Sequence, residues 1–281
     1  KQMSKKIWPR FYLTLVFILL YTPIFYLIFY SFNAGGTMNE FTGFTWEHYT
    51  AVFEDTRLLI IVLETFMLAF LSALIATIIG TFGAMGIYYT RKRRLRNTLM
   101  SLNNILLVSP DVIIGASFLI FFTTIGGLLR NFSLGFYTVL FSHVAFSIPI
   151  VVLMVLPKLK EMNDSMVDAA LDLGANYLQV IQRIILPFLS PGIIAGYFMA
   201  FTYSLDDFAV TFFVTGNGFS TLSVEIYSRA RQGISLEINA LSTLVFLFSM
   251  ILVVGYYLIS KENVPKKLKR GRQATRGVSS I

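Results

Sequence analysis

The sequence has no cysteine among its 281 residues, which excludes a disulfide framework and a thiolate metal site. Charged residues make up only 14%, against about 25% in ordinary soluble proteins. No GxxxxGK[ST] phosphate-binding loop is present, so this chain is not expected to hydrolyse ATP. Neither a nucleophile–base pair nor a recurrent metal-ligand spacing is evident. We therefore predict no catalytic residue, no metal and no cofactor on this chain.

What the sequence does contain is apolar residues, at 56% of the chain with a mean hydropathy of +0.70. They form long runs with almost no charge, and a helix of about 20 residues crosses the roughly 30 Å of bilayer hydrocarbon. Continuous apolarity without alternation argues against a closed β-barrel. The sequence predicts an all-α membrane protein with six transmembrane helices, at about 11–32, 64–88, 104–124, 134–156, 187–212 and 239–260.

The basic residues predict the orientation. Nineteen of the 23 Lys and Arg residues fall before the first span, in the second and fourth loops, or in the tail from Lys261 to Arg276. The positive-inside rule places these segments, and both termini, in the cytoplasm. We interpret the run Arg91–Arg96 as a topology signal with contacts to anionic lipid, and not as a nucleic-acid site.

The chain then divides into three regions: 1–63 with the N-terminal tail, first span and external loop; 64–260 as a five-helix core; and 261–281 as a basic cytoplasmic tail. The core contains a cytoplasmic loop at 158–186 that reads as two short helices around Gly174. Asp164 or Ser165 is expected to cap the first of them. The simple interpretation of the loop is a connecting hairpin; the functional one is a docking element for a cytoplasmic partner.

This loop resembles the EAA loop of ABC importer permeases. That pattern is Glu-Ala-Ala, three residues, Gly, nine residues, then Ile-x-Leu-Pro, and its spacing is kept here with Asp in the place of Glu. The matching residues are Asp168, Ala169, Ala170, Gly174, Ile184, Leu186 and Pro187. The resemblance implies the type I ABC importer permease fold, and it implies that these residues couple the chain to an ATPase.

Further segments between about residues 100 and 243 are similar to the spermidine/putrescine permease group, in particular its C-type subunit. They include "LLVSPDVIIG", "FSHVAFSIPIVV" and "FTYSLDDFAVTFFVTG". The resemblance implies a bacterial plasma membrane location. It also implies two cytoplasmic ATPase subunits that hold ATP and Mg, a second homologous permease subunit, and an extracytoplasmic polyamine-binding protein.

Ionisable residues inside membrane helices are costly and each is a functional hypothesis. The predicted spans hold Asp111, Asp206 and Asp207 with no Lys or Arg to pair with them. Carboxylates without a fixed counterion suit a mobile cation, and aromatic rings cover methylene stems and attract ammonium groups. We therefore predict a substrate pathway for polyamines, and its residues are Asp206, Asp207, Asp111, Ser204, Tyr203 and Trp46.

Simpler roles compete for several of these residues. Asp111 could sit in the first turn of a helix after Pro110, and Asp207 could cap a short helix after the fifth span. His143 is expected to bond a neighbouring helix, and Glu64 to reach the membrane surface. Adjacent residues diverge by about 100° on a helix, so Asp206 and Asp207 share one cavity only if the helix unwinds there.

The sequence leaves two other functions open. One is the same importer with ferric iron, sulfate or a sugar as its substrate. The other is an ion channel or antiporter that uses the same carboxylates, although a channel has no need of an ATPase-docking loop.

Overall fold

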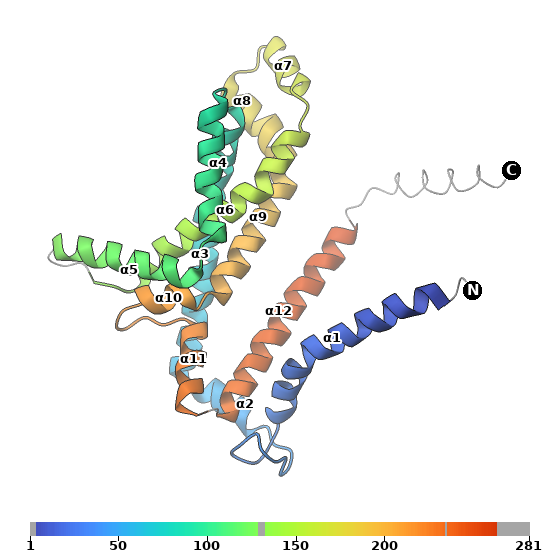
Figure 1. The fold of residues 1–281 in the computed structure, drawn as a ribbon, viewed down its shortest axis with the longest axis vertical. Coiled ribbons are helices and arrows are strands. Elements are labelled where there is room, and N and C mark those ends of the chain that lie inside the picture. The colour runs from blue at the N-terminus through green and yellow to red at the C-terminus, as the bar shows by residue number, and fades with distance from the viewer. Residues whose placement is uncertain (1–3, 129–132, 234, 263–281) are drawn as a thin grey trace. The chain divides into compact units, whose positions relative to one another are not determined.

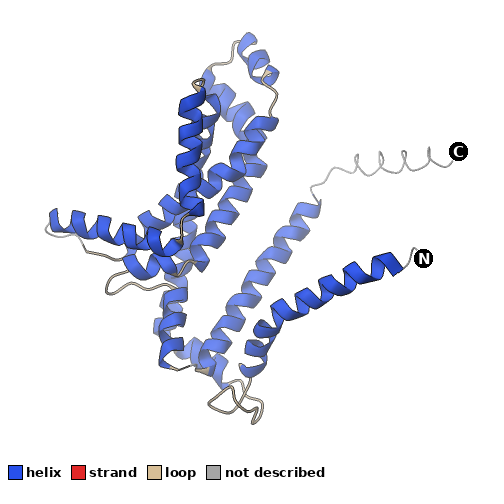
Figure 2. Cartoon of the chain, in the orientation of Figure 1, coloured by secondary structure: helices blue, strands red, loops and turns tan. Residues whose placement is uncertain are grey.

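The computed structural model describes residues 4–128, 133–233 and 235–262, and the tail region from residue 263 on lies outside them, as does Arg130. Within the described residues every regular element is a helix, apart from one isolated bridge between Asn33 and Phe44 (Figures 1 and 2). The predicted all-α class is confirmed. The elements are α1 (Ser4–Tyr30), α2 (Glu47–Glu54), α3 (Thr56–Tyr89), α4 (Arg93–Val108), α5 (Asp111–Leu128), α6 (Phe136–Glu161), α7 (Ser165–Asp172), α8 (Tyr177–Val180), a π-helical turn (Ile181–Ile185), α9 (Leu186–Asp206), α10 (Ala209–Val214), α11 (Leu222–Gln232) and α12 (Leu236–Glu262).

Four stretches of helix are long and apolar enough to cross a membrane. They are Pro9–Tyr30, Thr56–Tyr89, Phe136–Glu161 and Tyr177–Asp206. The bent pair α4–α5 would be a fifth, and α12 contributes a shorter apolar stretch, Leu236–Ile251. Multiple spans are therefore present, while the count of six and the orientation of the termini stay predictions.

The third predicted span, 104–124, is wrong as a continuous helix. α4 ends at Val108, α5 begins at Asp111, and the two axes differ by 105°. Pro110 explains the break, because a proline disfavours the helical conformation of the residue before it. Ser109 accordingly has an extended backbone, with ψ at 139°. The second span also begins earlier than residue 64, since α3 starts at Thr56.

Two compact units make up the chain, residues 1–55 with 229–281 and residues 56–228. This division differs from the three predicted regions, because the last apolar helix groups with the N-terminal segment. In the first unit, α12 packs against α1 and against α2, and a loop connects α1 to α2. An aromatic cluster there packs Trp46 against the rings of Phe32, Phe44 and Tyr49, at centroid distances of 5.0, 5.5 and 5.4 Å.

The second unit has its core where α3, α6 and α9 pack together. α3 presents small residues every four positions, and Ser72, Ala76, Gly80 and Ala84 are all buried. A Cβ on Gly80 would lie 2.7 Å from the Cβ of Val151, so α3 and α6 approach too closely there for any side chain. Gly196 of α9 lies against the same valine from the other side. Small residues thus set the helix spacing, as helix packing in a membrane requires.

Candidate functional site

The two adjacent aspartates lie where the fifth span is interrupted. α9 ends at Asp206, the backbone of Asp207 is extended, with ψ at 123°, and α10 begins at Ala209. The Asp207 carboxylate caps α10, because it accepts hydrogen bonds from the backbone N–H groups of Val210 at 3.3 Å and Thr211 at 2.8 Å. Asp207 therefore takes the simpler of its two proposed roles, that of a cap on the short helix after α9. Such a cap satisfies backbone donors that a short helix leaves free.

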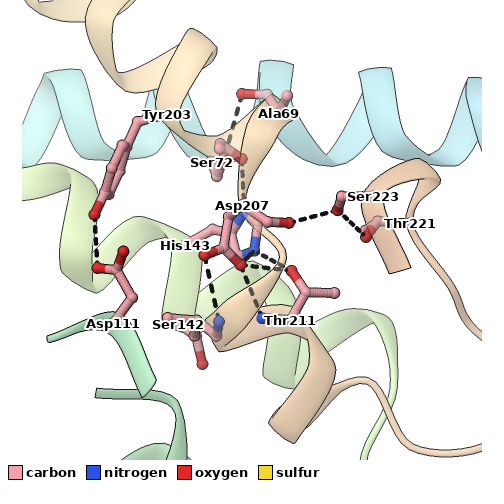
Figure 3. A network of polar contacts seen from close by, with 12 residues as sticks. Ala69, Ser72, Asp111, Ser142, His143, Tyr203, Asp207, Thr211, Thr221 and Ser223 are labelled. Atoms are coloured by element: carbon pink, nitrogen blue, oxygen red, sulfur yellow. Dashed lines mark hydrogen bonds and ion pairs between the residues drawn. The ribbon is translucent and has the colours of Figure 1, made fainter. Parts of the chain in front are cut away.

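The Asp207 side chain is only 6% exposed and belongs to a buried polar network (Figure 3). Its Oδ2 also accepts the Thr211 hydroxyl at 2.9 Å, and Nε2 of His143 lies 3.5 Å away. The Ser223 hydroxyl at the start of α11 donates to the backbone carbonyl of Asp207 at 2.6 Å. Both the carboxylate and the backbone of Asp207 are thus held by protein groups.

His143 joins four helices at the centre of this network. Its side chain is fully buried. Nδ1 lies 2.6 Å from the Ser204 hydroxyl on α9, and Nε2 lies 2.8 Å from the Thr211 hydroxyl on α10. Ser204 in turn lies 2.8 Å from the hydroxyl of Ser72 on α3. The expectation that His143 bonds neighbouring helices is confirmed, and Ser204 is a buried member of the same network.

Tyr203 and Asp111 form a second polar pair, to one side of the first. The Tyr203 hydroxyl donates to Oδ1 of Asp111 at 2.9 Å, and both residues are exposed (Figure 3). Asp111 lies in the first turn of α5, as expected for a residue that follows Pro110. The break between α4 and α5 is what carries Asp111 to the end of α9.

Asp206 differs from its neighbour. It is exposed, and among the described residues its carboxylate makes no hydrogen bond or ion pair. Because Tyr203 and Asp206 are three residues apart on α9, they lie on the same helix face. Ser204 and Asp207 are buried instead, and the backbone of Asp207 has already left the helix. The two adjacent carboxylates therefore have different surroundings and do not share one cavity.

The other sequence-predicted candidates lie elsewhere. Trp46 belongs to the aromatic cluster of the first unit, where it is 58% exposed. Glu64 is half-buried in α3. The structure brings together Asp111, Tyr203, Ser204 and Asp207, with Asp206 beside them, whereas the substrate-pathway role of all six predicted residues stays a prediction.

Sequence reasoning missed several members of this site. Ser72, Thr211 and Ser223 were not among the predicted site residues. The Asp207 carboxylate accepts from the N–H groups of Val210 and Thr211, three and four residues further on. That spacing is visible in the sequence, whereas the contacts of Ser72 and Ser223 join residues more than ten positions apart.

The hairpin at residues 158–186, for which the sequence predicts a coupling role, has α7 at its tip (Figure 1). α7 ends in a Schellman motif, in which Ala175 N–H donates to Ala170 C=O at 3.0 Å and Gly174 N–H to Leu171 C=O at 2.9 Å. Gly174 has φ +85° and open space around its Cα. The predicted turn at this glycine is confirmed, since the motif needs the left-handed conformation there.

Capping of α7 differs from the expectation. Neither Asp164 nor Ser165 makes a side-chain cap, and instead the Asn163 side chain accepts the N–H of Ser165 at 3.1 Å. The second helix has the stronger cap, a reciprocal pair between Asn176 and Gln179. From there the chain continues through the π-helical turn, which contains Ile184, into α9, which begins with Leu186 and Pro187.

The hairpin exposes apolar side chains that have no packing role within the described part of the chain. Leu173 is 89% exposed, Tyr177 76% and Leu178 62%. Asp168 and Ala169 are also exposed, while Ala170 is half-buried. Asp168 lines a cavity of about 590 Å³ between the hairpin and the end of α3, where the Tyr88 hydroxyl lies 3.4 Å from Asp164. An exposed apolar tip of this kind, beside polar residues, is typical of a surface that binds a partner protein.

Residues 76–269 match the family described as binding-protein-dependent transport system inner membrane component. The chain is 35% identical over 251 residues to the spermidine/putrescine transport system permease protein PotC of Escherichia coli (strain K12), covering 89% of this chain and 93% of that protein. It is 32% identical over 272 residues to the putrescine transport system permease protein PotI of the same strain, covering 96% of each.

Solved structures of ABC transporters share the fold. A chain of a bacterial transporter involved in import of the acidic polysaccharide alginate superposes with a TM-score of 0.72, at 16% identity, over 94% of this chain and 100% of that one. A chain of the MetNI methionine transporter, in an inward-facing conformation, superposes with a TM-score of 0.59, at 21% identity, over 72% of this chain and 94% of that one.

Proposed function

This chain belongs to the family of binding-protein-dependent transport system inner membrane components, and from that premise we propose that it is the polyamine-translocating permease subunit of an ATP-driven importer. It provides half of the pathway by alternating access and is not itself an enzyme. The similarity to the PotC and PotI permeases over about nine-tenths or more of the chain carries this proposal. The charges of the site support it independently.

The substrate class follows from those charges. Asp206 and the Asp111–Tyr203 pair present two carboxylates and a phenol on exposed positions, and no Lys or Arg contacts them within the described residues. An ammonium group fits a carboxylate, while a tyrosine ring covers the methylenes between two such groups. An anion such as sulfate would be repelled, and a sugar would not need the acids. Spermidine and putrescine are the cations that we propose.

Coupling uses the hairpin. The exposed Asp168, Ala169 and Leu173 would dock in a cleft of an ATPase subunit, with the Schellman turn at Gly174 fixing the shape of the tip. ATP and Mg would bind to that ATPase. Closure of the ATPase pair would rotate the closely packed α3, α6 and α9 as a body and open the site to one side of the membrane, and hydrolysis would return it.

The proposed assembly contains this chain, a second homologous permease subunit, two cytoplasmic ATPase subunits and an extracytoplasmic polyamine-binding protein. We place it in the bacterial cytoplasmic membrane, with its basic loops against anionic lipid and with no nucleic-acid partner. Trp46 is proposed to line the outer part of the pathway.

Uptake of radiolabelled spermidine and putrescine into proteoliposomes that contain the complete complex tests this function. We expect ATP-dependent accumulation that unlabelled polyamine suppresses and that sulfate, a sugar or ferric iron does not. Accumulation without ATP would favour a channel or antiporter. ATP-dependent uptake of another substrate alone would support an ATP-driven importer and contradict the assignment of polyamines as its substrate.

A further inference from the structure

We propose that His143 is the positioning residue of the pathway: it clamps the buried side of the end of α9, so that the Tyr203 and Asp206 side chains stay exposed. The inference rests on the proposed function and adds a residue that does not itself touch substrate. It also assigns Asp207 to this clamp, consisting of Ser72, His143, Ser204, Asp207 and Thr211, and leaves Asp206 as the substrate carboxylate.

Exposed and buried residues alternate along the end of α9. Both direct neighbours of the candidate substrate groups are partners of His143: Ser204 follows Tyr203 and lies 2.6 Å from Nδ1, and Asp207 follows Asp206 and lies 3.5 Å from Nε2. Adjacent positions on a helix differ by about 100°, so holding Ser204 inward turns Tyr203 away from the clamp. Holding Asp207 inward fixes the point at which the chain leaves the helix, directly after Asp206. The clamp therefore determines where Tyr203 and Asp206 point.

A second route links His143 to Tyr203 through packing. The His143 ring lies 4.8 Å from the ring of Phe146, and Phe146 meets the Tyr203 ring edge-on, with centroids 5.0 Å apart and planes at 89°. Tyr203 then reaches Asp111 through its hydroxyl. Aromatic pairs of this geometry restrict ring orientation. A change at His143 is thus transmitted to both exposed groups, through α9 and through Phe146.

The donors and acceptors around residue 143 explain why the sequence has a histidine there. With the proton on Nε2, the ring donates to the Thr211 hydroxyl, which donates to the Asp207 carboxylate, and Nδ1 accepts the Ser204 hydroxyl. Both nitrogens of the buried ring are then paired. An unpaired buried polar group would be unfavourable, and a histidine meets both demands while it bridges α9 and α10 across the break between them.

The break itself depends on the same contacts. α10 has only six residues, and its first N–H groups are capped by Asp207, whose backbone carbonyl accepts from Ser223. A helix this short does not keep its position by itself. Bonds from α6 through His143 and from α11 through Ser223 hold it on both sides.

The experiment uses the complete complex in proteoliposomes and compares His143→Ala, His143→Gln and Ser142→Ala. Gln places a polar group near the Nε2 position, and Ser142 is the matched control because its hydroxyl is equally buried on α6 but bonds only Thr138 C=O of its own helix. We expect His143→Ala to lower spermidine uptake at least tenfold at unchanged basal ATPase activity. His143→Gln should transport spermidine at about a third of the wild-type rate, and Ser142→Ala should match the wild type.

A second readout separates positioning from a general effect on stability. The binding protein is supplied loaded with substrate and at a saturating concentration. The ratio of spermidine to putrescine uptake should then change at least threefold in His143→Ala, because displaced Tyr203 and Asp206 side chains would contact the ammonium groups of a triamine and of a diamine to different extents. If His143→Ala does not assemble, Ser204→Ala and Thr211→Val carry the same expectation.

Assembled variants that transport both polyamines at the wild-type rate and ratio would overturn the role of His143. Absence of polyamine uptake by the wild-type complex would instead overturn the proposed function, so the two failures are distinguishable.

Discussion

At the scale of single residues, Asp206 and Asp207 are chemically identical neighbours with opposite surroundings. Asp207 is enclosed by His143 and two N–H donors, whereas Asp206 is exposed. The difference arises because α9 ends between them. Only one of the two carboxylates is therefore available to a cation on the exposed side.

Substitutions at these two positions should separate transport from stability. Asp206→Asn is expected to lower polyamine uptake roughly tenfold, equivalent to about 1.4 kcal/mol of lost binding to the moving cation, with unchanged yield of the complex. Uptake and size-exclusion profiles measure the two effects. Wild-type uptake by Asp206→Asn would remove this residue from the pathway.

Asp207→Ala should instead destabilise the protein by about 1–3 kcal/mol, because the backbone N–H of Thr211 and the Thr211 hydroxyl lose their acceptor in a buried place. A lower thermal midpoint of the detergent-purified complex checks this. An unchanged midpoint with impaired uptake would reverse the roles assigned to the two aspartates.

At the scale of elements, the coupling hairpin depends on one backbone conformation. Gly174→Ala places a Cβ on a residue with φ +85°, at a cost of about 1–2 kcal/mol, and we expect it to weaken ATPase docking. Gly218 is the matched control, since it has φ +95° and equally open surroundings but lies outside the hairpin. Transport-coupled ATPase activity should fall for Gly174→Ala and stay near wild type for Gly218→Ala. Equal losses in both would indicate strain alone.

The contact between α3 and α6 is a second element-scale feature. Gly80→Ala puts a methyl group 2.7 Å from the Val151 Cβ, and overpacking of this kind destabilises by about 1–3 kcal/mol. Gly86→Ala, on the same helix with nothing near its Cα, is the control. We expect a lower thermal midpoint for Gly80→Ala and a midpoint near that of the wild type for Gly86→Ala. Equal midpoints for the two variants would argue against this contact.

At the scale of the whole molecule, the absence of cysteine makes the predicted topology directly measurable. A single Ser165→Cys in the coupling hairpin should react with a membrane-impermeant maleimide only in inside-out vesicles. Thr37→Cys, in the loop after α1, should react only in intact cells. Both residues are exposed, so access to the reagent is limited by the membrane alone. Labelling of both from the same side would contradict the orientation.

Much of the architecture followed from the sequence, because apolar runs, basic loops and a spaced motif are local or regularly repeated. The all-α class and the turn at Gly174 were both predicted in this way. The continuous span at 104–124 was not correct, since the chain turns by 105° between α4 and α5, at Pro110. Hydropathy reports burial in lipid and carries little information about direction.

The sequence by itself determined that two carboxylates stand in an apolar segment without a basic partner, and that a hairpin of family-like spacing precedes them. Only the tertiary structure decided which carboxylate is available. That decision depends on where α9 ends and on two residues from helices distant in the chain, Ser72 and His143. Thr211, on the adjacent α10, completes the enclosure of Asp207. Residue types fix the charges that must be accommodated, whereas contacts between distant segments fix the side from which each charge is reached.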